Sequence, residues 1–152
     1  MQKKHFVSMA WVQGGIGYSS LPGACQEAGV NIRIEDHLLF SVAFNGEYSF
    51  NAYGGGFQDM AVMLGYNMQI TRFSLSFSGG ISSYSGINHI RQDTISKDYV
   101  GEGFLGVGLA LRAQAMYHFS RHFGTGVDLY ASLSPQSQAM VLLNLAYSPF
   151  KW

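Results

Sequence analysis

The sequence predicts an all-β chain, an eight-stranded antiparallel up-and-down transmembrane β-barrel formed by a single domain over residues 1–152. Three observations carry this prediction. Long stretches alternate between apolar residues and small or polar ones, charged residues are scarce, and tight turns alternate with longer loops. Charged residues make up 12% of the chain, against about 25% in ordinary soluble domains. No stretch approaches the roughly 20 consecutive apolar residues of a membrane-spanning helix.

The clearest alternation spans residues 105–131. Every second residue of its first half is apolar, and a similar pattern begins again at Phe123, after the short turn 120–122. Period-two alternation is typical of a β-strand with unlike faces, and two such strands about a tight turn form a hairpin. The intervening residues are mostly Gly, Ala and Gln, with few charges. We interpret this stretch as a membrane hairpin with lipid on one face and a narrow polar lumen on the other.

The first half of the chain is divided into four strands, at residues 6–18, 28–35, 38–45 and 60–70. The alternation is weakest in the first strand, because Met9 and Trp11 lie on the face opposite Val12 and Ile16. A loop at 19–26, marked by Pro22-Gly23, precedes the second strand. The second and third strands alternate on either side of a tight turn at 36–37. The fourth has an apolar residue at every second position and follows a long, glycine-rich loop at 46–59.

The second half contains four more strands, at residues 73–80, 105–119, 123–131 and 139–147. The first of these alternates Phe and Leu with Ser and follows a two-residue turn at 71–72. The longest loop, 82–103, separates it from the hairpin, and a short loop at 132–138 precedes the last strand. Short turns at one end and longer loops at the other are typical of membrane barrels, and this arrangement places both termini on the periplasmic side.

Charge placement supports the membrane interpretation. The chain has nine Lys and Arg and nine Asp and Glu residues, and those within the predicted strands all share the inward phase: Arg33, Glu35, Arg112 and Asp128. A charge facing mid-bilayer lipid would cost about 2–4 kcal/mol. We predict a polar lumen network composed of Arg33, Glu35, Arg112, Gln114, Asp128 and Asn144. The alternative is a soluble lipocalin-like barrel, which would carry far more charge on its outer face.

Arg112 and Asp128 lie on the two arms of the 105–131 hairpin. If the turn is centred on Ser120, the two residues face each other directly. If it is centred on Arg121, Asp128 faces Gln114 and Arg112 lies on the diagonal, still within reach. We expect them to pair in either register, because an unpaired charge in a narrow lumen is costly.

The run from Tyr117 to Tyr130, with the aromatic C-terminal residue Trp152, is similar to sequences of the eight-stranded outer-membrane barrels of Gram-negative bacteria. That class includes the OmpX-like proteins and the OmpA transmembrane domain. The resemblance implies a location in the cell outer membrane, in contact with the lipid bilayer and lipopolysaccharide.

An eight-stranded barrel is just wide enough for its own side chains to fill it, so a general porin is not expected. We predict a structural or accessory role, in which loops or barrel wall make the chain a subunit or partner of a larger outer-membrane assembly. The alternative is adhesion or ligand binding through the loops 46–59 and 82–103. The candidate partner-binding residues in these loops are Tyr48, Phe50, Tyr53, Phe57, Tyr84, His89 and Arg91.

A less favoured alternative is a lipid A-modifying esterase that uses His118 and Ser120. The residues His118-Phe119-Ser120 resemble the start of the His-x-Ser-Asn motif of outer-membrane lipid A deacylases, but Arg121 replaces the Asn, and no acidic residue follows Asp128. We therefore predict that the chain is not an enzyme. Neither a metal site nor a cofactor is predicted from the dispersed histidines and the single cysteine. The lack of a basic stripe predicts no binding to nucleic acid.

Overall fold

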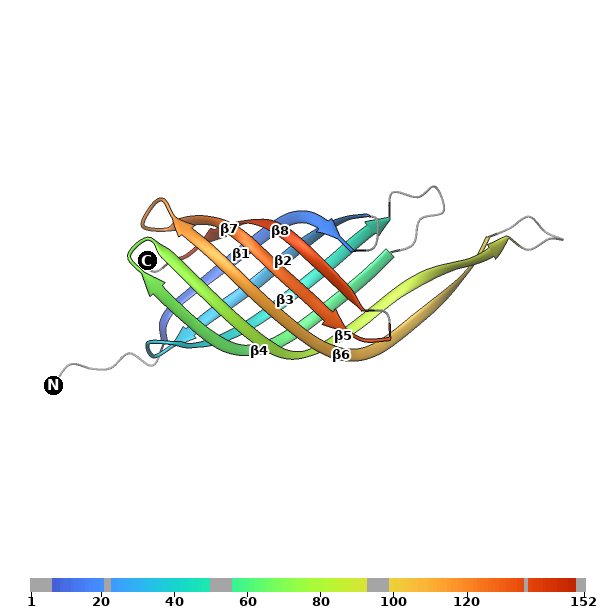
Figure 1. Ribbon diagram of the computed structural model, residues 1–152, viewed down its shortest axis with the longest axis horizontal. Helices are drawn as coiled ribbons and strands as arrows, with labels where there is room; N and C mark the ends of the chain where they lie inside the picture. Colours follow the sequence, from blue (N-terminus) through green and yellow to red (C-terminus); the bar gives the residue numbers. More distant parts are fainter. Residues whose placement is uncertain (1–6, 21–22, 50–55, 93–98, 136, 150–152) are drawn as a thin grey trace.

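The computed structural model describes residues 7–20, 23–49, 56–92, 99–135 and 137–149. It is a closed barrel in which each strand pairs antiparallel with its neighbours in the chain and β1 pairs with β8. The strands are β1 Val7–Ser19, β2 Gly23–Ile34, β3 Leu38–Ser49, β4 Gly56–Ile70, β5 Phe73–Gln92, β6 Tyr99–His118, β7 Phe123–Leu133 and β8 Gln138–Tyr147. They cross the barrel obliquely (Figure 1). The predicted fold class, with eight strands in up-and-down order, is confirmed. No helix in the described ranges is long and apolar enough to cross a membrane.

The two faces of each strand differ as the alternation predicts. Large apolar side chains stand on the outside of the barrel on every strand, as Ile16 on β1 and Leu143 on β8 do, with 73% and 67% of their surface exposed. Residues of the other phase are buried inside the barrel. In β1, where the alternation is weakest, Met9 and Trp11 are buried and Val12 and Ile16 are exposed, so the predicted phase is correct.

Tight turns close one end of the barrel. β4 and β5 are joined by Thr71-Arg72, with Ile70 paired to Phe73 and Thr71 at φ 53°. β2 and β3 pair as far as Ile34 and Leu38. Short turns between twisted strands require residues with positive φ.

The predicted loops 46–59 and 82–103 are wrong in extent. β3 continues to Ser49, β4 starts at Gly56, β5 runs to Gln92 and β6 starts at Tyr99. Strand pairing depends on backbone hydrogen bonds and on neighbours, so Gly- and Ser-rich stretches with little β-propensity of their own are extended by their partners.

β5 and β6 are much longer than the other strands. The pairing of β4 with β5 ends at Gly56 and Ile87, and the pairing of β6 with β7 ends at Leu109 and Leu133. We call residues 88–92 and 99–108, which lie beyond these points, the β5–β6 extension. It projects well past the rest of the barrel at the loop end (Figure 1).

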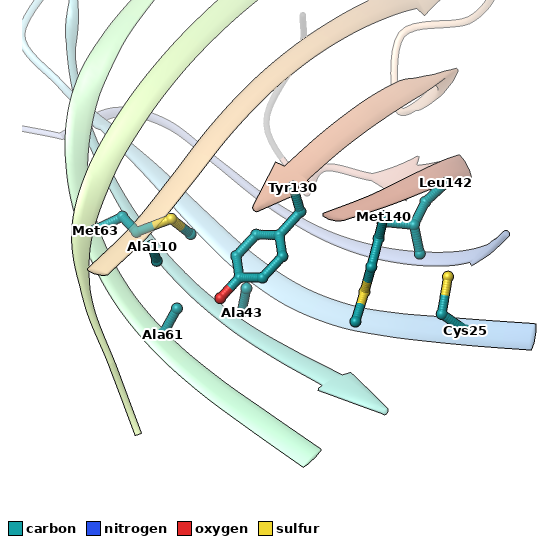
Figure 2. Packing of buried hydrophobic residues seen from close by; sticks show 8 residues of the cluster. All are labelled: Cys25, Ala43, Ala61, Met63, Ala110, Tyr130, Met140 and Leu142. Atoms are coloured by element: carbon teal, nitrogen blue, oxygen red, sulfur yellow. The ribbon is translucent and has the colours of Figure 1, made fainter. Parts of the chain in front are cut away.

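The interior has apolar layers on either side of a polar one. The layer nearer the tight turns contains Met9, Trp11, Leu39, Met116 and Ala146. The layer nearer the loops contains Cys25, Ala43, Ala61, Met63, Ala110, Tyr130, Met140 and Leu142. Figure 2 shows the Tyr130 ring projecting from its strand into the middle of this second layer. Along β6, Gln114 and Arg112 stand between Met116 of the first layer and Ala110 of the second, so the polar layer crosses the middle of the barrel.

Candidate functional site

Three charged side chains meet in the polar layer. Arg112 of β6 forms ion pairs with both Glu27 of β2 and Asp128 of β7, and all three residues are 5% exposed or less. Their strands bring them together because each residue has the inward phase of its own alternation. Gln114 is the cross-strand partner of Asp128, and Arg112 is the partner of Tyr130. The register is therefore the one in which Arg112 and Asp128 lie on the diagonal.

Amide side chains surround this charged cluster. The Gln13 Oε1 atom accepts hydrogen bonds from Asn31 Nδ2 at 2.8 Å, Gln114 Nε2 at 3.0 Å and Trp11 Nε1 at 3.2 Å. Its Nε2 donates to Glu27 Oε1 at 2.8 Å. Gln13 thus joins the acidic residue of β2 to amides on β2 and β6. It is the centre of the network in the described part of the lumen.

Asp128 receives further hydrogen bonds beside its ion pair. Gln114 Nε2 and Asn144 Nδ2 each donate to its Oδ2 atom at 3.2 Å. The structure thus brings together four of the six predicted network residues: Arg112, Gln114, Asp128 and Asn144. With Glu27 and Gln13 they span the barrel from β2 to β6 to β8.

Arg33 lies in a separate group near the tight turns. Its Nη1 donates to Gln69 Oε1 at 2.8 Å and to Asn67 Oδ1 at 3.3 Å, and its Nε donates to Ser8 Oγ at 3.1 Å. The prediction that Glu35 faces the lumen is wrong. Glu35 follows the end of β2, has φ 54° and is exposed in the turn. The turn begins one residue earlier than the alternation suggests, so the inward phase ends at Arg33.

Sequence reasoning missed several buried acidic residues. Glu27 falls between the predicted loop 19–26 and the predicted strand 28–35, and Glu47 and Asp59 fall in the predicted loop 46–59, yet all three lie within strands and are buried. Glu47 accepts a hydrogen bond from Ser19 Oγ at 2.8 Å, and Asp59 accepts one from the Tyr130 hydroxyl at 2.9 Å. The signal was present, since each acid continues the inward phase of its strand beyond the predicted end.

His118 and Ser120 do not form the hydrogen-bonded pair that a nucleophile and its base require. The buried His118 Nε2 is 3.0 Å from Ser74 Oγ. Ser120 is exposed, and its Oγ accepts hydrogen bonds from the backbone N–H groups of His122 at 3.3 Å and Phe123 at 3.0 Å. Ser120 thus holds the β6–β7 turn. Within the described ranges, no group of three His, Cys, Asp or Glu residues could hold a metal ion.

The predicted partner-binding residues fall into different surroundings. Phe57 and Tyr84, predicted to lie in loops, are instead buried in β4 and β5. Their rings stack with centroids 5.9 Å apart, and both contact Phe104 of β6. They face inward because they continue the inward phase of their strands. The backbone of Tyr48 belongs to β3, and that of His89 and Arg91 belongs to β5. Phe50 and Tyr53 lie outside the described residues.

The β5–β6 extension has an open backbone edge. Gly108 of β6 lies against Leu133 and Ser134, whereas residues 99–107 pair with β5 and, within the described part of the chain, have no strand partner on the β7 side. His118 N donates to Arg72 O on the β5 side. Since N–H groups alternate sides along an antiparallel strand, those of odd-numbered residues, including Leu105 and Val107, point to the open edge. The outward side chains of these two residues are 80% and 73% exposed.

The polar layer leads to a prediction about conduction. Side chains from β1, β2, β6, β7 and β8 interlock across the lumen at one level. An eight-stranded barrel leaves little room beyond its own side chains, so we expect only small or no currents in planar lipid bilayers. Large, steady, porin-like conductance from the purified folded protein would contradict this expectation.

Several solved structures share the fold. Neisserial surface protein A matches with a TM-score of 0.70 and 9% identity, over 91% of this chain and 95% of that one. Ail, the attachment invasion locus protein of Yersinia pestis, solved with the heparin analogue sucrose octasulfate, matches with a TM-score of 0.67 and 14% identity, over 92% and 97%. The outer membrane enzyme PagL matches with a TM-score of 0.57 and 11% identity, over 90% and 98%. Neither protein-family models nor curated protein sequences give a match.

The chain therefore has the fold of the small eight-stranded outer-membrane β-barrels, as the sequence resemblance predicted. Proteins with this fold include a surface protein, an attachment protein and an enzyme. The fold alone consequently does not select one function, which has to be argued from particular sites.

Proposed function

We propose that this chain resides in the outer membrane and acts by binding a protein partner along the open edge of the β5–β6 extension. The observation that carries the proposal is the β7-side edge of residues 99–107, which has no strand partner among the described residues. A strand edge with free N–H and C=O groups is a template on which another chain can add a strand. Natural proteins usually protect such edges with charge, proline or a covering segment.

The side chains at this edge favour the same role. Leu105 and Val107 present apolar side chains on the outer face, and their backbone polar groups point to the open edge. An added strand would gain backbone hydrogen bonds and apolar contacts from the same two residues. This combination gives strand addition both its affinity and its specificity.

Aromatic rings pack against the base of the extension from inside the barrel. The rings of Phe57, Tyr84 and Phe104 contact one another there. The Tyr84 ring lies across Gly106, where an added Cβ would be 2.3 Å from the Tyr84 hydroxyl. A preorganised strand loses less entropy when a partner binds than a flexible loop does.

Such an edge is compatible with both roles predicted from the sequence. A partner embedded in the same membrane would make the chain an accessory subunit, and an external partner would make it an adhesin or receptor. The proposal contains no catalytic step, because Ser120 supports a turn and His118 contacts Ser74 instead.

A photo-crosslinking residue at position 105, in the cells that make the protein, tests the proposal. We expect a discrete protein adduct there and none at position 143, whose side chain is exposed on the outer wall of β8. Val107→Pro removes an edge N–H and should abolish the adduct, whereas Val107→Thr keeps that N–H and should retain it. A membrane-protein adduct supports the accessory role, and an external protein supports adhesion. Absence of any adduct, or an adduct that persists in Val107→Pro, would overturn the proposal.

A further inference from the structure

The outer wall of the barrel carries a groove of about 1000 Å³ that runs from β7 and β8 across β1 to β5. Small residues produce the hollow. Gly14 of β1 pairs with Ala28 of β2, and Gly46 of β3 pairs with both Gln26 and Gln58 on its two neighbours. All line the groove. Large outward side chains cover the backbone over the rest of the wall. At these small residues the backbone stays within reach of a ligand.

The two ends of the groove differ in chemistry. Leu143 and Leu145 line one end. Gln58 and Ser83 line the other end, beside the apolar side chains of Phe44 and Met60. The polar end lies toward the loops, because Gln58 is close to the start of β4 at Gly56. The apolar end reaches Thr125, close to the start of β7 at the tight turns. The groove therefore crosses the wall obliquely, from a leucine-lined zone to a zone at the loop end that combines polar side chains with Phe44 and Met60.

We propose that this groove holds one glycolipid of the outer leaflet, with an acyl chain against Gly14 and Ala28 and the sugar headgroup against Gln58 and Ser83. The loop end of a membrane barrel faces the outside, which places the polar end at the level of outer-leaflet headgroups. Small residues in a membrane-facing surface favour close packing, which supplies binding energy where lipid offers no hydrophobic driving force.

The polar end fits a sugar better than a phosphate. Amide and hydroxyl groups both donate and accept, which matches the hydroxyl and amide groups of an N-acylated sugar. Phosphate recognition normally uses Arg or Lys, and the described residues lining the groove include neither. Glu27 and Asp59 contribute to the lining, but both are buried residues of the inward phase. A transmembrane segment of another protein is the competing occupant, and the experiment separates the two.

Two positions in the groove accept a Cβ with ordinary contacts only. A Cβ at Gly14 would lie 3.7 Å from the Glu27 carbonyl oxygen, and one at Gly46 would lie 3.6 Å from the Gln26 side chain, both ordinary contacts. The test variant is Gly14→Leu with Gly46→Leu. The matched control is Gly79→Leu on the outer wall of β5, where a Cβ would meet the flexible end of Leu111 at 3.3 Å. A gel shift between unheated and boiled samples verifies that each variant folds.

Native mass spectrometry of the refolded protein in detergent, titrated with purified lipid A or with phosphatidylglycerol, tests the proposal. We expect a one-to-one lipid A adduct that the groove-filling variant weakens by roughly tenfold and the control leaves unchanged. Gln58→Leu with Ser83→Ala should reduce lipid A binding to the level of phosphatidylglycerol. Equal binding of both lipids by the unaltered protein, or full lipid A binding by the filled variant, would overturn the proposal. So would a co-purifying membrane protein that only the filled variant loses. Ser83 pairs with Val107 of the β5–β6 extension, but the groove-filling substitutions lie on β1 and β3, so their result does not depend on that extension.

Discussion

Arg112→Met is expected to destabilise the folded barrel by about 3–5 kcal/mol, because it leaves buried carboxylates without their cation. Arg112 is ion-paired with Glu27 and Asp128 at once. The substitution would leave both acids in the lumen with only amide partners. Asp128→Ala should cost less, because Glu27 still pairs with Arg112. The measurement is the free energy of unfolding, from urea titrations of the protein refolded into lipid vesicles.

The control for this prediction neutralises the whole cluster. In the variant with Arg112→Met, Glu27→Gln and Asp128→Asn, no buried charge remains unpaired, so we expect much of the lost stability to return. Gln13 and Asn144 can hydrogen-bond to the new amides as they do to the carboxylates. If the three substitutions act additively, so that the triple variant is the least stable of the series, the charged cluster is not a coupled unit.

Gly80→Val is expected to prevent normal pairing of β4 and β5. A Cβ at Gly80 would lie 2.0 Å from the Val62 carbonyl oxygen on the neighbouring strand, a distance that requires the backbones to move apart. Overpacking in well-packed protein typically costs about 1–3 kcal/mol, and here the contact is with backbone, which cannot rotate away. We expect most of the protein to lose the heat-dependent gel shift of a folded barrel.

Gly14→Ala is the matched control for this effect. Its Cβ would meet only the Glu27 carbonyl oxygen, at 3.7 Å, so this glycine can be replaced without strain. The folded fraction of Gly14→Ala should equal that of the unaltered chain. Equal folding of Gly80→Val and Gly14→Ala would show that the close approach of β4 to β5 is not required.

The period-two alternation was enough to predict the number of strands, their order and which face of each strand points outward. The alternation fixes which face of each strand points outward. Only one choice places apolar residues such as Val127 and Leu129 on β7, or Val141 and Leu143 on β8, against lipid. A shift of one residue would turn every one of them inward. The phase also identified Arg112 and Asp128 as lumen residues, and two possible turn centres limited the choice of register.

The strand ends were harder to predict. Pro22-Gly23 and the glycines near residue 54 are strong turn signals, so the predicted strands exclude Glu27, Glu47 and Asp59. In the structure the neighbouring strands extend these segments, and the acids are buried beside Arg112, Ser19 and Tyr130 respectively. The period-two pattern continued through all three, but polar residues on both faces masked it. Glu35 shows the opposite error, because its positive φ ends the strand one residue early.

The open edge and the outer groove depend on relations between strands. The edge of β6 is open where β7 is too short to pair with it. The relative lengths of the two strands cannot be read from the sequence of either strand alone. The groove requires Gly14, Ala28 and Gly46 to fall on neighbouring strands in matching register. Both features follow from the closed topology and were not accessible from the composition of any single segment.

The central claim, that the apolar outer wall faces lipid, is tested most directly by spin labels at positions 141, 143 and 145 of β8, in a Cys25→Ala background reconstituted into vesicles. Their side chains are exposed on the outer wall. A label at position 105 on the β5–β6 extension provides the comparison. We expect collisions with oxygen, and not with a water-soluble nickel complex, at the three β8 positions, and nickel access at position 105. Nickel access at all four positions would mean that water surrounds the wall, and would contradict the transmembrane account.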